Sequence, residues 1–169
     1  MTVAPAWFAR VGTPISEHDR SDAAAILGAR GFPVDAPVVL IPSWRAAALW
    51  TNDVAMAECW DDDEDEREAL WTRAAADLGE STLLAQLTAA TASAAPQVRS
   101  AAQAAAGGVA TADPEAMAIA AASALLALHQ CVLAQLVRVA PGHVFLHKYA
   151  LYARGRWALG YRDGTYGIL

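Results

Sequence analysis

Residues 113–139 read DPEAMAIAAASALLALHQCVLAQLVRV, and this stretch decides the fold of the chain. Asp113 suits the N-cap of a helix, Pro114 suits the first helical position, and Glu115 is favoured at the positive end of the helix dipole. Beyond this first turn, apolar residues point in nearly every direction around the helical axis, so the helix must be buried on most sides. The sequence therefore predicts a central core helix over residues 114–139, about 39 Å long.

The same stretch has nearly the length of a membrane span, which needs about 20 consecutive apolar residues. His129, Gln130 and Gln135 interrupt it, and no basic cluster flanks either end. We therefore interpret it as the buried helix of a soluble protein with no membrane contact. The first residues of the chain lack the basic start and apolar core of a signal peptide, so we expect a cytoplasmic protein.

Length and charge narrow the class of protein. At 169 residues the chain is long enough to bury a core, and we expect a mainly α helical bundle that forms one domain, residues 1–169. The two cysteines, Cys59 and Cys131, match no metal or redox motif, so we interpret them as free thiols. The net charge of −6 argues against nucleic-acid binding and favours a basic partner.

Further helices are indicated wherever a capping residue precedes apolar residues at helical spacing. They are a helix over residues 21–29 capped by Ser16 or Asp19, a helix capped by Ser43, a helix that starts at Ser81 after Gly79, and a helix over residues 97–106 that ends at Gly107. We expect Pro96 to separate the last two helices, because proline breaks the hydrogen bonding of a helix interior.

The end of the chain has the pattern of a β-hairpin. Residues 157–162 and 165–169 are rich in apolar and aromatic residues, and they flank Asp163 and Gly164. An Asp-Gly pair between two such runs is the strongest short hairpin signal in a sequence. Because an isolated hairpin is only marginally stable, we expect it to pack on the helices or to pair with an N-terminal strand at residues 37–41.

The most polarised segment is residues 61–68, DDDEDERE, in which seven of eight residues are acidic. Carboxylates are favoured at a helix N-terminus, and we expect this run to open a helix, but seven exceed what one first turn stabilises. The surplus is either a solvated helix face or a patch that meets a cationic partner. A calcium loop fits less well, because the run lacks the alternating ligands and central glycine of an EF-hand. The candidate partner-binding residues are Trp60, Asp61, Asp62, Asp63, Glu64, Asp65, Glu66, Glu68 and Trp71.

Catalytic motifs are missing from the sequence. His143 and His147 are four residues apart and would share one helix face, where they are weak candidates for metal ligands, but no third ligand is apparent. We favour packing or hydrogen-bonding roles for both, and we interpret His129 as a satisfied core histidine. No nucleophile motif and no phosphate loop occurs, so we expect neither enzyme activity nor a cofactor.

Residues 145–160 read FLHKYALYARGRWALG. This segment resembles the "FLRKYxLFxxGRWPLG" ending of small bacterial proteins of toxin-immunity loci, including those of contact-dependent growth inhibition. His147 stands where that pattern has a basic residue, and Ala158 stands where it has proline. The resemblance implies a cytoplasmic immunity protein that binds and neutralises a cognate toxin domain, and it implies no catalytic residue.

The functional expectation joins this resemblance to the charge. We expect an immunity protein whose acidic run meets the basic surface of a toxin such as a nuclease, with Trp60 and Trp71 as aromatic anchors. Two alternatives stay open. One is a metal-dependent enzyme that uses His143 and His147, and the other is a structural protein that assembles with itself through its alanine-rich helices.

Overall fold

The fold is mainly helical, with a small sheet formed largely by the end of the chain, as the sequence predicts. The computed structural model describes residues 5–51, 57–107 and 114–169, and the side chains of residues 57–61 lie outside this description. Within it the elements are α1 (Glu17–Ala29), β1 (Val38–Leu40), α2 (Trp44–Thr51), α3 (Ala57–Leu78), α4 (Glu80–Ala106), α5 (Pro114–Leu136), α6 (Val144–Ala153), β2 (Ala158–Arg162) and β3 (Thr165–Ile168).

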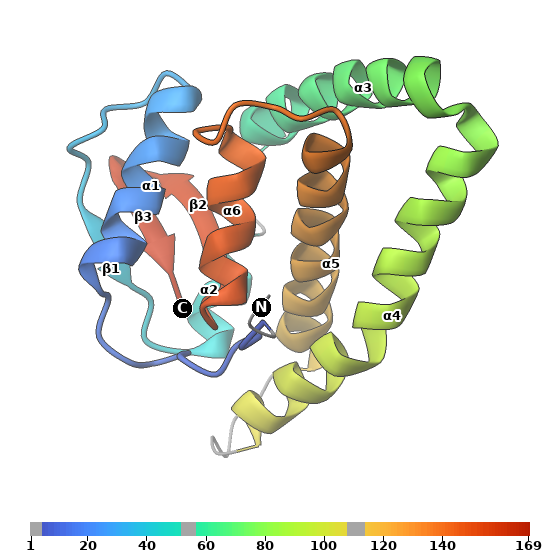
Figure 1. Ribbon diagram of the computed structural model, residues 1–169. Helices are drawn as coiled ribbons and strands as arrows, with labels where there is room; N and C mark the ends of the chain where they lie inside the picture. The colour runs from blue at the N-terminus through green and yellow to red at the C-terminus, as the bar shows by residue number, and fades with distance from the viewer. Residues whose placement is uncertain (1–4, 52–56, 108–113) are drawn as a thin grey trace.

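Helix α5 is the predicted central helix, and it runs between α4 and α6 (Figure 1). It begins at Pro114 as expected, while Asp113 lies outside the described residues. It ends at Leu136, three residues early, because Arg138 adopts a positive φ of 52° and the chain turns there. Among the described helices, α5 alone is long and apolar enough to cross a membrane, and 44% of its most apolar window is buried in the fold. Helices α2, α3, α4 and α6 all pack against it.

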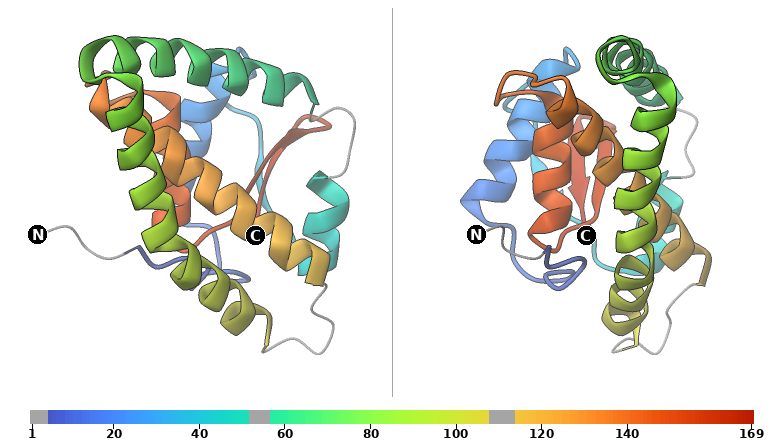
Figure 2. Two further views of the ribbon diagram at one scale, coloured as in Figure 1. Left: turned by 90° about the vertical axis from the view of Figure 1, so that its right-hand side faces the viewer. Right: turned by 45° about the vertical axis from the view of Figure 1, so that its right-hand side comes forward.

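The sheet has the order β1-β3-β2, so the last strand of the chain is central. β2 and β3 form the predicted hairpin, and Asp163 and Gly164 both take the positive φ that a tight hairpin turn requires. β1 pairs with β3 in parallel, which confirms the expected N-terminal partner strand. Helices α1 and α6 lie on one side of the sheet and α2 on the other (Figures 1 and 2). A side chain at Gly167 of β3 would meet the Trp50 ring of α2 at 2.8 Å, so only glycine fits there.

Helix α4 corrects two expectations. Ser81 is not a cap, since α4 begins at Glu80, and Pro96 does not separate two helices but lies inside one. Proline in a helix interior costs about 3 kcal/mol. Two features offset this cost. The neighbouring residues are mostly alanine, the best helix former, and buried side chains on both sides of the proline, Leu87 and Val98 among them, keep the helix packed.

The segment of residues 145–160 is structural. Phe145, Leu151, Tyr152, Arg156 and Trp157 are at most 1% exposed. The four apolar and aromatic side chains among them belong to the two clusters of buried residues that form the core. This part of the chain therefore determines how α6 joins β2 and presents little surface to a partner.

Candidate functional site

The acidic run at residues 61–68 lies inside helix α3 and does not open it. α3 begins at Ala57, so the run starts at the fifth residue of the helix, after its first turn. The expectation that these acids form the N-terminus is therefore wrong, because the helix dipole stabilises carboxylates only within that turn. The partners of the individual side chains explain the run better.

The helical repeat divides the run between two faces of α3. Successive residues turn by about 100° around a helix, so Asp63 and Glu66 lie on the same side as Leu70 and Ala74. Leu70 and Ala74 are buried in the core, at 4% and 1% exposed. Asp63 and Glu66 are therefore directed toward the rest of the fold.

These two inner acids form ion pairs with basic groups of other helices. Asp63 pairs with Arg30, at the end of α1, and accepts a hydrogen bond from Lys148 of α6 at 2.5 Å. Glu66 accepts a hydrogen bond from Arg30 at 3.1 Å and lies 2.8 Å from the Nε2 atom of His143. The pairs join α3 to α1 and α6, so Asp63 and Glu66 stabilise the fold and are not offered to a partner.

Four described acids of the run are exposed, and three of them form no ion pair within the described residues. Asp62, Asp65 and Glu68 are exposed, and within the described residues none of them forms an ion pair. We call these three residues the outer acidic face. Glu64 is also exposed, but it pairs with Arg67 of the same helix.

The remaining candidates of this region contribute less. Trp71 is partly buried and packs against the core, which limits its use as an aromatic anchor. The side chains of Trp60 and Asp61 lie outside the described part of the chain. Among the candidate residues whose side chains the structure describes, the accessible ones without an ion pair are therefore those of the outer acidic face.

The two histidines that could have held a metal bind separate partners. His143 caps α6, with its Nδ1 atom accepting from the backbone N–H of Phe145 at 3.2 Å and its Nε2 atom beside Glu66. His147 lies 2.6 Å from Asp22 of α1. Among the described residues, no three side chains of the metal-binding types come together. The geometry gives the metal-enzyme alternative no support.

Two other expectations concern α5. His129 is not the satisfied core histidine that we expected, because its Nδ1 atom is buried without a partner among the described residues. Burial, followed by the charge of Arg67, lowers the pKa of His129, which favours the neutral ring. Cys131 is a buried free thiol as expected, and burial raises its pKa to about 11.

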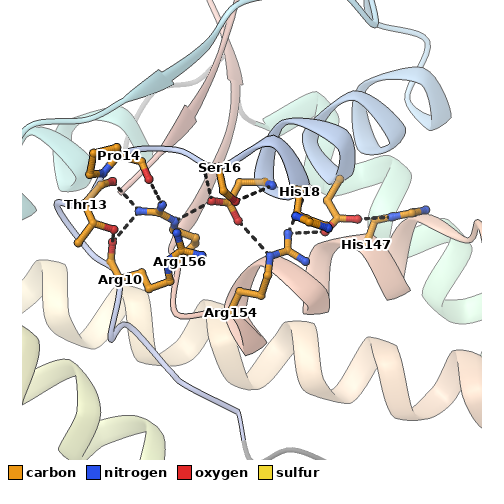
Figure 3. A network of polar contacts seen from close by, with 10 residues as sticks. Arg10, Thr13, Pro14, Ser16, His18, His147, Arg154 and Arg156 are labelled. Carbon is orange, nitrogen blue, oxygen red and sulfur yellow. Dashed lines mark hydrogen bonds and ion pairs between the residues drawn. The ribbon is translucent and has the colours of Figure 1, made fainter.

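A second polar network, which sequence reasoning missed, joins the N-terminal segment to α1 and to the segment after α6 (Figure 3). Its centre is the ion pair of Asp19 and Arg156, 3.1 Å apart, in which both side chains are fully buried. Arg156 also donates to the carbonyl oxygens of Arg10 at 2.6 Å, Thr13 at 2.7 Å and Pro14. An ion pair is stable in a protein interior only when its hydrogen bonds are satisfied. Here carbonyl oxygens of the N-terminal segment satisfy Arg156, so the network fixes this segment against the fold.

Asp19 is held by several donors at once. Its carboxylate accepts from the backbone N–H of Ser16 in a capping box and from Arg154 at 3.0 Å. Burial raises the pKa of Asp19, but the hydrogen bonds from Ser16 and Arg154 and the charge of Arg156 outweigh it and leave the pKa at about 2, below the usual 3.8. The folded protein therefore favours the ionised form of Asp19.

This shift predicts a loss of stability in acid. A carboxyl group whose pKa is lowered by folding stabilises the protein at all pH values above its unfolded pKa, and it loses this contribution as the pH falls toward its folded pKa. For Asp19 the contribution is about 2 kcal/mol, lost between about pH 4 and pH 2. We expect the free energy of unfolding, measured in urea, to fall more steeply over this pH range for the wild type than for Asp19→Asn. Equal slopes for the two proteins would contradict the assignment.

A cavity of about 340 Å³ lies among α1, α5, α6 and β2. Its walls are mainly apolar and include Ile119 and Leu126 of α5 and Leu159 of β2. At one place the walls carry charge, where Lys148 and Asp63 meet. The sequence did not predict the cavity, because it indicated only that α5 is buried on most sides.

The basic residues near the C-terminus are largely occupied. Lys148, Arg154 and Arg156 all form ion pairs with carboxylates of α1 or α3, and Arg162 lies over the ring of Trp50. Lys148 pairs with Asp63 of the acidic run, whereas Arg154 and Arg156 pair with carboxylates of α1. The chain has been compared with protein-family models, with curated proteins and with solved structures, and no match was found in any of the three comparisons.

Proposed function

We propose that this protein is a cytoplasmic immunity protein that binds a cognate toxin domain, such as a nuclease, through the outer acidic face. The observation that carries the proposal is the division of the acidic run. Asp63 and Glu66 are neutralised inside the fold, whereas Asp62, Asp65 and Glu68 remain exposed. The ion pairs that account for Asp63 and Glu66 do not account for these three residues, which are available to a partner.

The spacing of the outer acidic face suits a docking surface. Its first and last residues, Asp62 and Glu68, lie about 9 Å apart along the helix axis. Helix α3 lies across one end of the molecule, where these side chains are exposed (Figures 1 and 2). Clustered charge of one sign attracts an oppositely charged partner and speeds its association, an effect that salt weakens. The net charge of −6 acts in the same direction.

The proposal predicts that the outer acidic face is needed for protection against the toxin. The variant Asp62→Asn/Asp65→Asn/Glu68→Gln removes three exposed charges, and we expect it to bind the toxin domain encoded by the neighbouring gene at least about tenfold more weakly. Affinity would be measured by calorimetry at low salt, together with growth of cells that express the toxin. We expect the wild type to restore growth and the variant to do so poorly.

The matched control removes the same charge elsewhere. Asp35→Asn/Asp77→Asn/Glu80→Gln changes three exposed acids outside the outer acidic face, and it should bind as the wild type does. Equal weakening by both variants would show that only net charge matters. Failure of the wild type to bind the neighbouring product would contradict the proposed function itself.

A further inference from the structure

One side of helix α5 faces the cavity described above. The sequence makes α5 apolar all around, and α4, α6, α2 and α3 pack against it. Ile119, Ser123 and Leu126, which follow one another at helical spacing, line the cavity. Ile119 and Leu126 are apolar and only partly buried, so a ligand in the cavity would cover apolar surface that the described residues leave accessible.

From this we infer that the cavity is a binding site for a small, uncharged and mainly apolar molecule that carries one hydrogen-bond acceptor. The inference goes beyond the proposed function and does not depend on it, because the outer acidic face contributes no residue to the cavity. It assigns a ligand to a second region of the molecule, on the inner side of α3.

The size and lining of the cavity support a small ligand. Its volume of about 340 Å³ lies at the lower end of the 300–1,000 Å³ that is typical of small-molecule sites. Such sites are mostly apolar, with a few polar groups that orient the ligand. The lining fits this description. Most of it is apolar, and its charged residues, Arg30, Asp63 and Lys148, form one cluster at the wall.

The charges at the wall indicate an uncharged ligand. Arg30 and Lys148 are balanced by Asp63 and by Glu66, which pairs with Arg30. An ion that entered the cavity would lose its hydration and find no unbalanced opposite charge, which is costly in an apolar site. A neutral molecule avoids this cost.

Lys148 supplies the hydrogen bond that orients the ligand. Its ammonium group has three donors, and within the described residues one of them is used, on Asp63 at 2.5 Å. A neutral acceptor such as a hydroxyl or carbonyl oxygen can take a second donor without displacing Asp63. The apolar body of the ligand would then lie along Ile119 and Leu126.

The test uses the neutral dye N-phenyl-1-naphthylamine, whose fluorescence rises in an apolar site. We expect saturable binding to the full-length protein at neutral pH. Of three competitors with the same chain length, decanol should displace the dye at lower concentration than decanoate or decylamine, because only decanol is uncharged. Absence of saturable binding would overturn the inference, and stronger competition by either ion would overturn the assignment of a neutral ligand.

Two variants place the binding inside the cavity. Leu126→Trp and Ile119→Trp both fill it, and either should raise the Kd of the dye at least about tenfold. The control Ala122→Trp adds the same ring at an exposed position of α5 and should leave the Kd unchanged. A thermal midpoint close to that of the wild type identifies the folded variant to be used. If a folded cavity-filling variant binds the dye as the wild type does, the cavity is not the site.

These measurements separate the inference from the proposed function. The variant Asp62→Asn/Asp65→Asn/Glu68→Gln should bind the dye normally while binding the toxin domain weakly. Leu126→Trp should bind the toxin domain normally and the dye weakly. Loss of both activities in either variant would contradict the independence of the two sites.

Discussion

Replacing Arg156 by methionine is expected to lower the free energy of unfolding by about 3–5 kcal/mol, the cost of breaking a buried ion pair from one side. Methionine keeps most of the apolar stem but takes from the buried Asp19 the fully buried one of its two arginine partners, so that only Arg154 remains. It also removes the donors that satisfy the carbonyl oxygens of Arg10, Thr13 and Pro14. Urea unfolding followed by tryptophan fluorescence would measure the change.

The control for this substitution is Arg99→Met. Arg99 is an exposed arginine of α4, and substitutions of this kind change stability by about 0.5 kcal/mol or less. If Arg156→Met were no more destabilising than Arg99→Met, the network of Figure 3 would not hold the N-terminal segment in place.

Replacing Gly155 by alanine is expected to cost about 2–4 kcal/mol, from two separate sources. Gly155 has a φ of +93°, which strains a residue with a side chain. The added Cβ atom would also lie 2.9 Å from the backbone nitrogen of Arg10 and 3.0 Å from that of Ala9. Backbone cannot move aside as a flexible side chain can, so the N-terminal segment would have to shift.

Gly12→Ala separates the two sources. Gly12 has a φ of +74°, but a Cβ atom there would meet nothing within 4 Å. We therefore expect Gly12→Ala to lower the free energy of unfolding only through backbone strain, by about 1 kcal/mol. Thermal unfolding of both variants would show the difference, and equal losses would mean that the close approach at Gly155 does not matter.

The elements that sequence predicted well are those with a strong local cause. Helix α5 follows from its apolar residues and from Pro114, and the hairpin follows from the Asp-Gly pair. The Ser16 cap depends on atoms only three residues apart. Each of these signals is complete within a short stretch of chain.

The misjudged features depend on distant parts of the chain. Pro96 lies within a helix because residues of α4 on both sides of it are buried against the rest of the fold. Asp63 and Glu66 form ion pairs with Arg30 and Lys148. These partners are distant in the sequence, so no local pattern predicts the pairs. The inner direction of these two acids could still have been read from the spacing of Leu70 and Ala74 on the same helix face.

The candidate site was therefore predicted only in part. The composition of residues 61–68 identifies an acidic helix, but it does not distinguish acids that are paired inside the fold from acids that are exposed. The structure separates those that hold α3 in place from those that remain exposed. The cavity beside α5 could not be predicted, because an apolar residue has the same sequence signal whether it packs against protein or lines an open space.

The most direct test of the proposed function is the rate of association with the neighbouring toxin domain, measured by stopped-flow fluorescence between about 50 and 300 mM salt. We expect the wild type to associate rapidly at low salt and to slow steeply as salt increases. Asp62→Asn/Asp65→Asn/Glu68→Gln should associate more slowly and depend less on salt. Rates that are equal for the two proteins at every salt concentration would contradict docking through the outer acidic face.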